Sequence, residues 1–208
     1  MPDVLAPATD APVELRAIEI REQHLWGLDL SGSDAADLQL IDSRVEDVDL
    51  TGTFLQRASI RDTFVNGGSW ANVDASNAVL KRVEMRGVRL TGAVLAGAKM
   101  NDVTFVDCRI DLSSLRFAQL ERVRFENSRM EEADLYEARL SSVVFVRCDL
   151  TKMSLAKATF LRCEMRDCDL DGIGNPEQLR GVGMPWPDIV RTAAVLAAAV
   201  GVHVVDSD

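Results

Sequence analysis

The chain of 208 residues is poor in aromatic side chains, which make up 5% of it, and it has no long apolar run. Its hydrophobic content of 47% excludes a disordered chain, so aliphatic and small residues must fill the core. The most apolar segment, residues 193–202, has about half the length that a membrane span needs. The N-terminus lacks the basic start and apolar stretch of a signal peptide. We therefore expect a cytoplasmic protein that does not bind membranes.

Positive charge is also in deficit, since 33 acidic residues face 23 basic ones and the net charge is −10. This balance argues against direct binding of nucleic acid or anionic lipid, because phosphate binding requires a cationic surface. The acidity is concentrated early. Residues 1–80 carry −9, residues 81–170 carry +2 and residues 171–208 carry −3.

Motifs for chemistry are missing as well. The sequence has no GxxxxGK[ST], no GxGxxG after a strand, no GxSxG and no HExxH. Its two histidines, His24 and His203, lie near opposite ends of the chain, which argues against a shared metal site or acid–base pair. We predict a protein that is not an enzyme and that needs no cofactor and no metal.

What the sequence does have is a beat of five. Every fifth residue from Ile20 to Leu170 is apolar, without one exception among 31 positions. A spacing of five fits neither a helix nor a strand and indicates a repeat architecture. The residue two before each centre is mostly small, and this second inward position holds all four cysteines: Cys108, Cys148, Cys163 and Cys168. They lack a paired CxxC spacing, so a buried apolar role is favoured over metal binding or a disulfide.

A second beat of twenty groups four of these units into one turn. Residues of one kind recur at this spacing, as in the six alanines Ala58, Ala78, Ala98, Ala118, Ala138 and Ala158. Four five-residue sides therefore close one coil of a square tube. Successive coils should stack at about 4.8 Å because their backbone groups must pair.

The five-residue unit resembles the consensus of the pentapeptide-repeat family, a small residue, Asp or Asn, Leu or Phe, and two polar residues. Ala133-Asp134-Leu135-Tyr136-Glu137 and Cys148-Asp149-Leu150-Thr151-Lys152 show it. The resemblance implies an all-β solenoid, a right-handed quadrilateral β-helix of about 7.5 coils with a C-terminal α-helical cap. We divide the chain into a lead and cap (1–17), the β-helix (18–172) and a C-terminal helical segment (173–208). Arg89, Arg109 and Arg129 replace the consensus Asp or Asn, and we expect an ion-pair lattice there with Asp111 and Glu131.

The C-terminal segment breaks the beat of five. Pro187 and Asp188 suit the start of a helix over about 187–200, and Gly201 suits its end. One reading is a cap on the last coil with Trp186 as its anchor. The placement also resembles the dimerisation module of gyrase-binding members of the family, which implies a homodimer through Trp186, Ile189, Val190, Ala193, Leu196 and Val200.

Two functions remain open. The layout resembles that of the quinolone-resistance members of the family, which implies a DNA-mimicking modulator or protector of DNA gyrase, a type II topoisomerase. Its predicted binding surface is an acidic face of Asp29, Asp34, Asp37, Asp42, Glu46, Asp47 and Asp49. The alternative is a scaffold that holds another protein through Phe54, Phe64, Val144 and Val146. The early acids would then serve solubility and oppose edge-to-edge aggregation.

Overall fold

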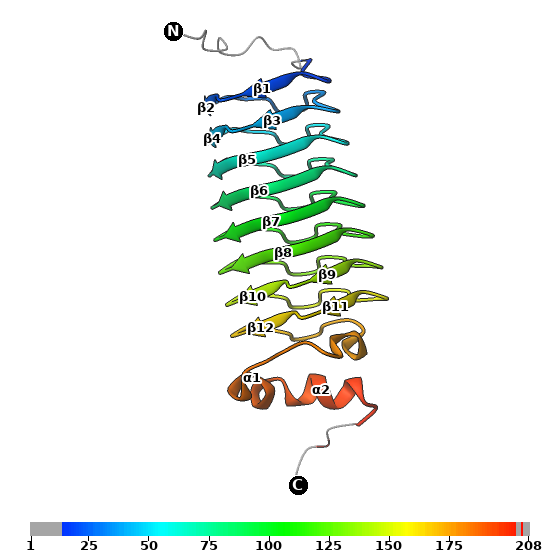
Figure 1. Cartoon of the computed structure of the whole chain (residues 1–208). Coiled ribbons are helices and arrows are strands. Elements are labelled where there is room, and N and C mark those ends of the chain that lie inside the picture. Colours follow the sequence, from blue (N-terminus) through cyan, green and yellow to red (C-terminus); the bar gives the residue numbers. More distant parts are fainter. Residues whose placement is uncertain (1–13, 203–204, 206–208) are drawn as a thin grey trace.

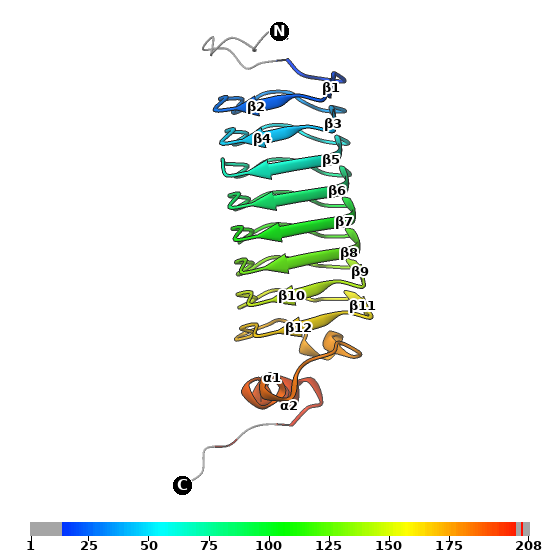
Figure 2. The ribbon, with the colours of Figure 1, turned by 60° about the vertical axis from the view of Figure 1, so that its left-hand side comes forward.

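The computed structural model describes residues 14–202 and 205, and these residues form a straight parallel β-solenoid closed by short helices at its C-terminal end (Figure 1). The strands stack in chain order from β1 to β12, so each coil contacts only the coil before and the coil after it (Figure 2). This is the quasi-one-dimensional arrangement of a repeat protein.

Two of the four sides of the tube carry the strands. On β5 to β8 the strand continues around the corner between these sides, whereas the other coils have two short strands. The strands are β1 (Glu19–Arg21), β2 (His24–Trp26), β3 (Gln39–Ile41), β4 (Arg44–Glu46), β5 (Ser59–Asn66), β6 (Val79–Arg86), β7 (Lys99–Val106), β8 (Gln119–Glu126), β9 (Arg139–Ser141), β10 (Val144–Val146), β11 (Thr159–Leu161) and β12 (Glu164–Arg166).

Every strand pair is parallel with a register of 20 residues, for example Met100 on Leu120 and Phe105 on Phe125. Bridges between single residues connect the other two sides with the same register, from Glu14 on Asp34 to Ser154 on Gly174. The predicted β-helix with four five-residue sides per coil is therefore confirmed.

Each side ends at a corner where the backbone turns through the left-handed region. Asp42 (φ 49°) and Arg82 (φ 52°) hold equivalent corners two coils apart. Gly68 shows where only glycine fits, because its φ is 79° and a Cβ there would lie 2.3 Å from the carbonyl oxygen of Val48. Apart from such positions, the corners accept charged residues and point them into solvent.

The interior is a single apolar core that runs the length of the tube. The rings of Phe105, Phe125 and Phe145 stack with centroids 4.9 and 5.1 Å apart, and all four cysteines are buried and free. The Trp70 indole nitrogen is buried without a hydrogen-bond partner. Two internal cavities of about 10 and 30 Å³ are lined only by apolar side chains, which offer no groups for chemistry.

The C-terminal segment packs below the last coil. It contains a 3₁₀-helix η1 (Pro176–Leu179), α1 (Trp186–Arg191) and α2 (Ala193–Ala199). The single helix expected over about 187–200 is thus wrong in one respect, since it is interrupted at Thr192 (φ −99°, ψ 16°). The buried Thr192 hydroxyl donates a hydrogen bond to the carbonyl oxygen of Asp188 (2.8 Å), a side-chain contact that favours a bend.

The predicted anchor of this segment is also wrong. Trp186 is 74% exposed, whereas Asp188 and Thr192 are buried against the last coil. The backbone pairs Glu164 with Gly183 and so extends the last coil, but at a spacing of 19 rather than 20 residues. We keep 1–17, 18–172 and 173–208 as a proposed division of the chain.

Candidate partner-binding surfaces

The four sides of the tube give each outward side chain a fixed place. Side A carries β1, β3, β9, β11 and the first parts of β5 to β8, and side B carries β2, β4, β10, β12 and their last parts. Side C carries the bridge row from Asp29 to Asp169, and side D the row from Glu14 to Gly174.

The seven acidic residues predicted as one face do not share a side. Asp29 and Asp49 lie on side C, Asp34 lies on side D and Glu46 lies on side B. Asp37, Asp42 and Asp47 occupy three different corners, because the seven span about one full coil of the sequence. Together they form an acidic belt around the tube.

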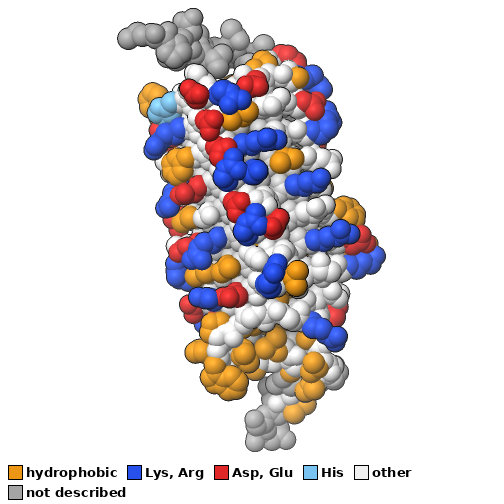
Figure 3. Space-filling model, viewed as in Figure 1, with side chains coloured by type: hydrophobic (Ala, Val, Ile, Leu, Met, Phe, Trp, Pro, Cys, Tyr) orange, Lys and Arg blue, Asp and Glu red, His pale blue; other side chains and the backbone are white. Residues whose placement is uncertain are grey.

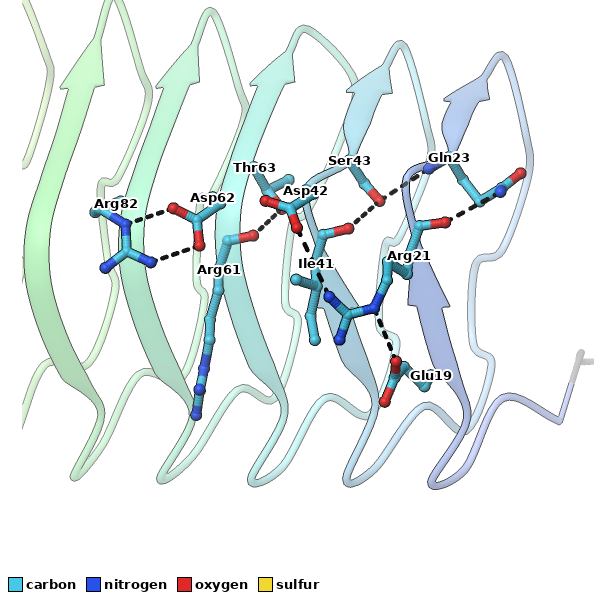
Figure 4. Close-up of polar contacts among 10 residues, drawn as sticks. All are labelled: Glu19, Arg21, Gln23, Ile41, Asp42, Ser43, Arg61, Asp62, Thr63 and Arg82. Atoms are coloured by element: carbon cyan, nitrogen blue, oxygen red, sulfur yellow. Dashed lines mark hydrogen bonds and ion pairs between the residues drawn. The ribbon is translucent and has the colours of Figure 1, made fainter.

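Four members of the acidic belt are paired with cations. Arg16 contacts Asp34, Arg57 binds Asp37 at 2.6 Å, Arg21 lies 3.7 Å from Asp42, and Glu46 accepts hydrogen bonds from Arg44 and His24, each at 2.7 Å. Figure 4 shows the Arg21–Asp42 pair and, one coil further, Asp62 with Arg82. The guanidinium of Arg57 lowers the pKa of Asp37, and Arg44 followed by His24 lowers the pKa of Glu46.

The other three members, Asp29, Asp47 and Asp49, form no ion pair with any described residue. One carboxylate oxygen of Asp29 accepts the Ser31 backbone N–H (3.0 Å), and one of Asp49 accepts that of Thr51 (2.8 Å). The hydrogen bonds from Ser31 lower the pKa of Asp29. These three carboxylates therefore present their charge to solvent.

The first two coils are acidic on all sides, since residues 14–56 contain ten acidic residues and three arginines. Two coils rise by about 10 Å at about 4.8 Å each. Duplex DNA carries about six charges over that length. The net charge of −7 on residues 14–56 is therefore close to the charge of a DNA segment of equal length.

The row of Arg89, Arg109 and Arg129 lies on side C with the arginines stacked on one another. Arg129 contacts Glu131 and lies 3.8 Å from Asp149 and 4.0 Å from Asp111. Among the described residues Arg89 and Arg109 form no ion pair. The expected lattice with Asp111 and Glu131 is thus present only around Arg129.

The residues predicted for dimerisation divide into two groups. Trp186, Val190 and Val200 are exposed at 74%, 58% and 77%, and Ala193 is also exposed. Ile189 and Leu196 are half-buried, and Leu196 packs against the core. Figure 3 shows hydrophobic side chains gathered at this end of the molecule, which leaves an apolar surface of the kind that a partner covers.

The apolar residues named for a scaffold role are less exposed than expected. Phe54 is 48% exposed, but Phe64 is half-buried with the Arg44 guanidinium 5.0 Å from its ring centroid, and Val146 is buried. The larger exposed side chains on the tube are Trp26, Leu112, Phe117 and Leu161. Leu112 and Phe117 stand at corners, where the repeat pattern otherwise has polar residues, and that exception in the sequence is the signal for them.

No arrangement for catalysis is found in the part of the chain that the structure describes. It contains no group of three or more His, Cys, Asp or Glu residues placed to hold a metal ion, and no helix in it is long and apolar enough to span a membrane. His24 pairs with Glu46, and His203 lies outside the described residues. The largest cavity, of about 540 Å³, is an open groove between the last coil and the C-terminal helices.

Comparison with known proteins gives one family and several solved structures. The family model for pentapeptide repeats matches residues 89–127, 113–151 and 133–172, with eight copies of the repeat. No curated protein matches the sequence.

The solved structures are similar at low identity. HetL, a pentapeptide repeat protein involved in heterocyst differentiation regulation from Nostoc sp. strain PCC 7120, is 21% identical, with 86% of this chain and 92% of that chain covered and a TM-score of 0.37. QnrB1, a plasmid-mediated fluoroquinolone resistance protein, is 18% identical over 92% of each chain, with a TM-score of 0.44. Rfr23 from Cyanothece 51142 is 19% identical over 47% of this chain and 67% of that one, with a TM-score of 0.44. With its five-residue units, its register of 20 and the family match, the chain belongs to the pentapeptide-repeat proteins.

Proposed function

We propose that this pentapeptide-repeat protein is a non-enzymatic binding protein whose first two coils take the place of DNA on a type II topoisomerase. The observation that carries the proposal is the net charge of −7 on residues 14–56, distributed around the whole tube at the density of duplex DNA. The resemblance of the five-residue repeat to the gyrase-binding members of the family supplies the class of partner.

The acidic section is restricted to one end of the rod. Residues 81–170 carry a net charge of +2, so the later coils do not continue a DNA-like surface. A topoisomerase would therefore contact the N-terminal coils, and the exposed Trp186, Val190 and Val200 at the other end would join two chains into a cytoplasmic homodimer. Such a dimer would present one acidic end on each side of a symmetric partner.

A second candidate is a scaffold that holds an unrelated protein. It is favoured by large apolar side chains that protrude from the tube, with Trp26 at 67% and Leu112 at 59% exposure. Side chains of this type at the centre of an interface contribute much of its binding energy.

The experiment that separates the two is ATP-dependent supercoiling by DNA gyrase, titrated with this protein in the presence and absence of a fluoroquinolone. Inhibition of supercoiling, or fewer drug-induced DNA breaks, is the expected result. A folded protein without effect at tens of micromolar would exclude the topoisomerase proposal and leave the scaffold.

A further inference from the structure

Positive charge gathers on one side of the rod, a feature that a count along the sequence does not show. We define the basic side as the outward and corner residues of side A from Arg57 to Arg162. It carries nine Lys and Arg residues and four carboxylates, a net charge of +5 in a chain of net −10. Figure 3 shows many of the blue side chains over these strands.

The carboxylates of the basic side are all occupied. Asp62 and Asp102 each bind the corner arginine of the next coil, Arg82 or Arg122, and Arg122 also binds Glu121. Lys157 lies 3.1 Å from Glu137. These contacts follow from the stacking of equivalent corners, and they leave no carboxylate for the remaining cations.

Five exposed cations of the basic side form no ion pair with a described residue: Arg61, Lys81, Lys99, Arg139 and Arg162. Arg61 stacks directly on Lys81, and Lys99 and Arg139 share one row with Gln119 between them. From Arg61 to Arg162 the side rises five coils, or about 24 Å. An extended peptide of about seven residues spans that length.

Two large apolar side chains interrupt this charged surface. Phe117 is 50% exposed and Leu161 is 58% exposed. The Phe117 ring meets the Tyr136 ring edge-on at 5.6 Å, and the Arg116 guanidinium and the Lys157 ammonium lie 4.4 and 4.9 Å from the Tyr136 centroid. The aromatic pair is therefore held in place before a partner arrives, which lowers the entropy cost of binding.

We propose that the basic side is a docking surface for an extended acidic segment of a partner protein, with Phe117 and Leu161 as apolar contacts. Unpaired cations beside ordered apolar side chains suit a segment that alternates carboxylates with apolar residues. A protein segment fits better than nucleic acid because the rest of the chain carries a net charge of −15, which would repel a long polyanion. A short segment can cover this side alone. This surface is separate from the acidic belt of the proposed function, and the proposal stands without it.

The test is a binding measurement with a defined probe. A fluorescein-labelled peptide of about ten residues, with Glu at every second position, places its carboxylates on one face at about 6.8 Å intervals. Anisotropy at low salt is compared for the unchanged protein, the variant Lys99→Gln with Arg139→Gln, and the control Arg89→Gln with Arg109→Gln. Both pairs are exposed cations without ion pairs, and the variants have equal net charge, but the control pair lies on side C. A duplex DNA oligonucleotide is the second probe.

We expect the Lys99 and Arg139 changes to weaken peptide binding about tenfold, since two direct charge contacts are lost, and the control to stay within about twofold. Replacing Phe117 by Ala should weaken binding further at unchanged charge. Equal losses in both variants would show attraction by net charge alone and overturn the proposal. So would absence of peptide binding by the unchanged protein, or tighter binding of the DNA than of the peptide.

Discussion

The carboxylate of Asp188 in α1 accepts a hydrogen bond from the backbone N–H of Asp167 in the last coil at 2.8 Å. In earlier coils this N–H binds a carbonyl of the next coil, as Arg147 N–H does with Arg166. The last coil has no successor, and the buried Asp188 supplies the missing acceptor. Its other oxygen accepts from Arg191 at 2.7 Å, so one side chain satisfies the end of the solenoid and holds the helix to it.

Replacing Asp188 by Ala should open the C-terminal cap. The change leaves the Asp167 N–H and Arg191 without their acceptor, at a cost of about 2 kcal/mol. Hydrogen exchange should show lost protection in 164–199 while the central coils stay protected. The control Asp171→Ala removes an exposed carboxylate of the same coil and should leave protection unchanged. Equal exchange in both variants would show that Asp188 does not hold the cap.

Replacing Phe125 by Ala should destabilise the centre of the rod. Its ring is fully buried between Phe105 and Phe145, and removing such a ring costs about 3 to 5 kcal/mol. Denaturant unfolding followed by circular dichroism measures the loss. Phe54→Ala removes a ring that is 48% exposed and should cost less than about 1 kcal/mol. A loss as small for Phe125 as for Phe54 would contradict the stacked core.

Acid should weaken the corner ion pairs. Hydrogen bonds from Arg57, Arg82 and Arg122 lower the pKa values of Asp37, Asp62 and Asp102 from their ordinary value of 3.8. Because these pKa values are lower in the folded chain, the pairs stabilise it above about pH 3.8 and lose that contribution as the pH falls through the folded-state pKa values.

The melting temperature of a triple variant, with Arg57, Arg82 and Arg122 replaced by Gln, should therefore fall less on acidification than that of the unchanged protein. The control replaces three cations without ion pairs, Arg89, Arg109 and Arg139, and should keep the full acid dependence. Identical acid profiles in all three proteins would show that the corner pairs contribute nothing.

The cysteines should be inert while the protein is folded. All four are buried, and burial raises the pKa of Cys108 to about 11. A thiolate is the reactive form, so an aromatic disulfide reagent in mildly alkaline buffer should label none of them until denaturant is added. Rapid labelling of any cysteine in the native protein would show that its coil opens.

The interior was predictable because each inward position repeats. A fixed beat of five makes every centre from Ile20 to Leu170 a core residue, and stacking identical residues such as the Ala58–Ala78 pair sets the register at 20. The free, buried cysteines follow from the same pattern. Sequence also indicated a C-terminal helix, because Pro187 and Asp188 are local signals.

The surface was harder to predict because its properties depend on neighbours 20 residues away and on the side of the tube. Asp42 and Asp49 look alike in the sequence, but one lies beside Arg21 and the other has no cation partner. The break at Thr192 and the exposure of Trp186 depend on how α1 meets the last coil. Counting charge along the chain also concealed the basic side, since its cations alternate with acidic residues of other sides.

The most direct test of the DNA-like first coils is displacement of labelled duplex DNA from DNA gyrase. One triple variant changes Asp29, Asp47 and Asp49 to Asn, which removes three unpaired charges but keeps an oxygen for the Ser31 and Thr51 N–H groups. The matched control changes Asp107, Asp149 and Asp169 to Asn at the equivalent corner and row positions of later coils. The account predicts that the unchanged protein and the control displace the DNA while the first variant needs at least about tenfold more protein. Equal displacement by both variants, or none by the unchanged protein, would contradict it.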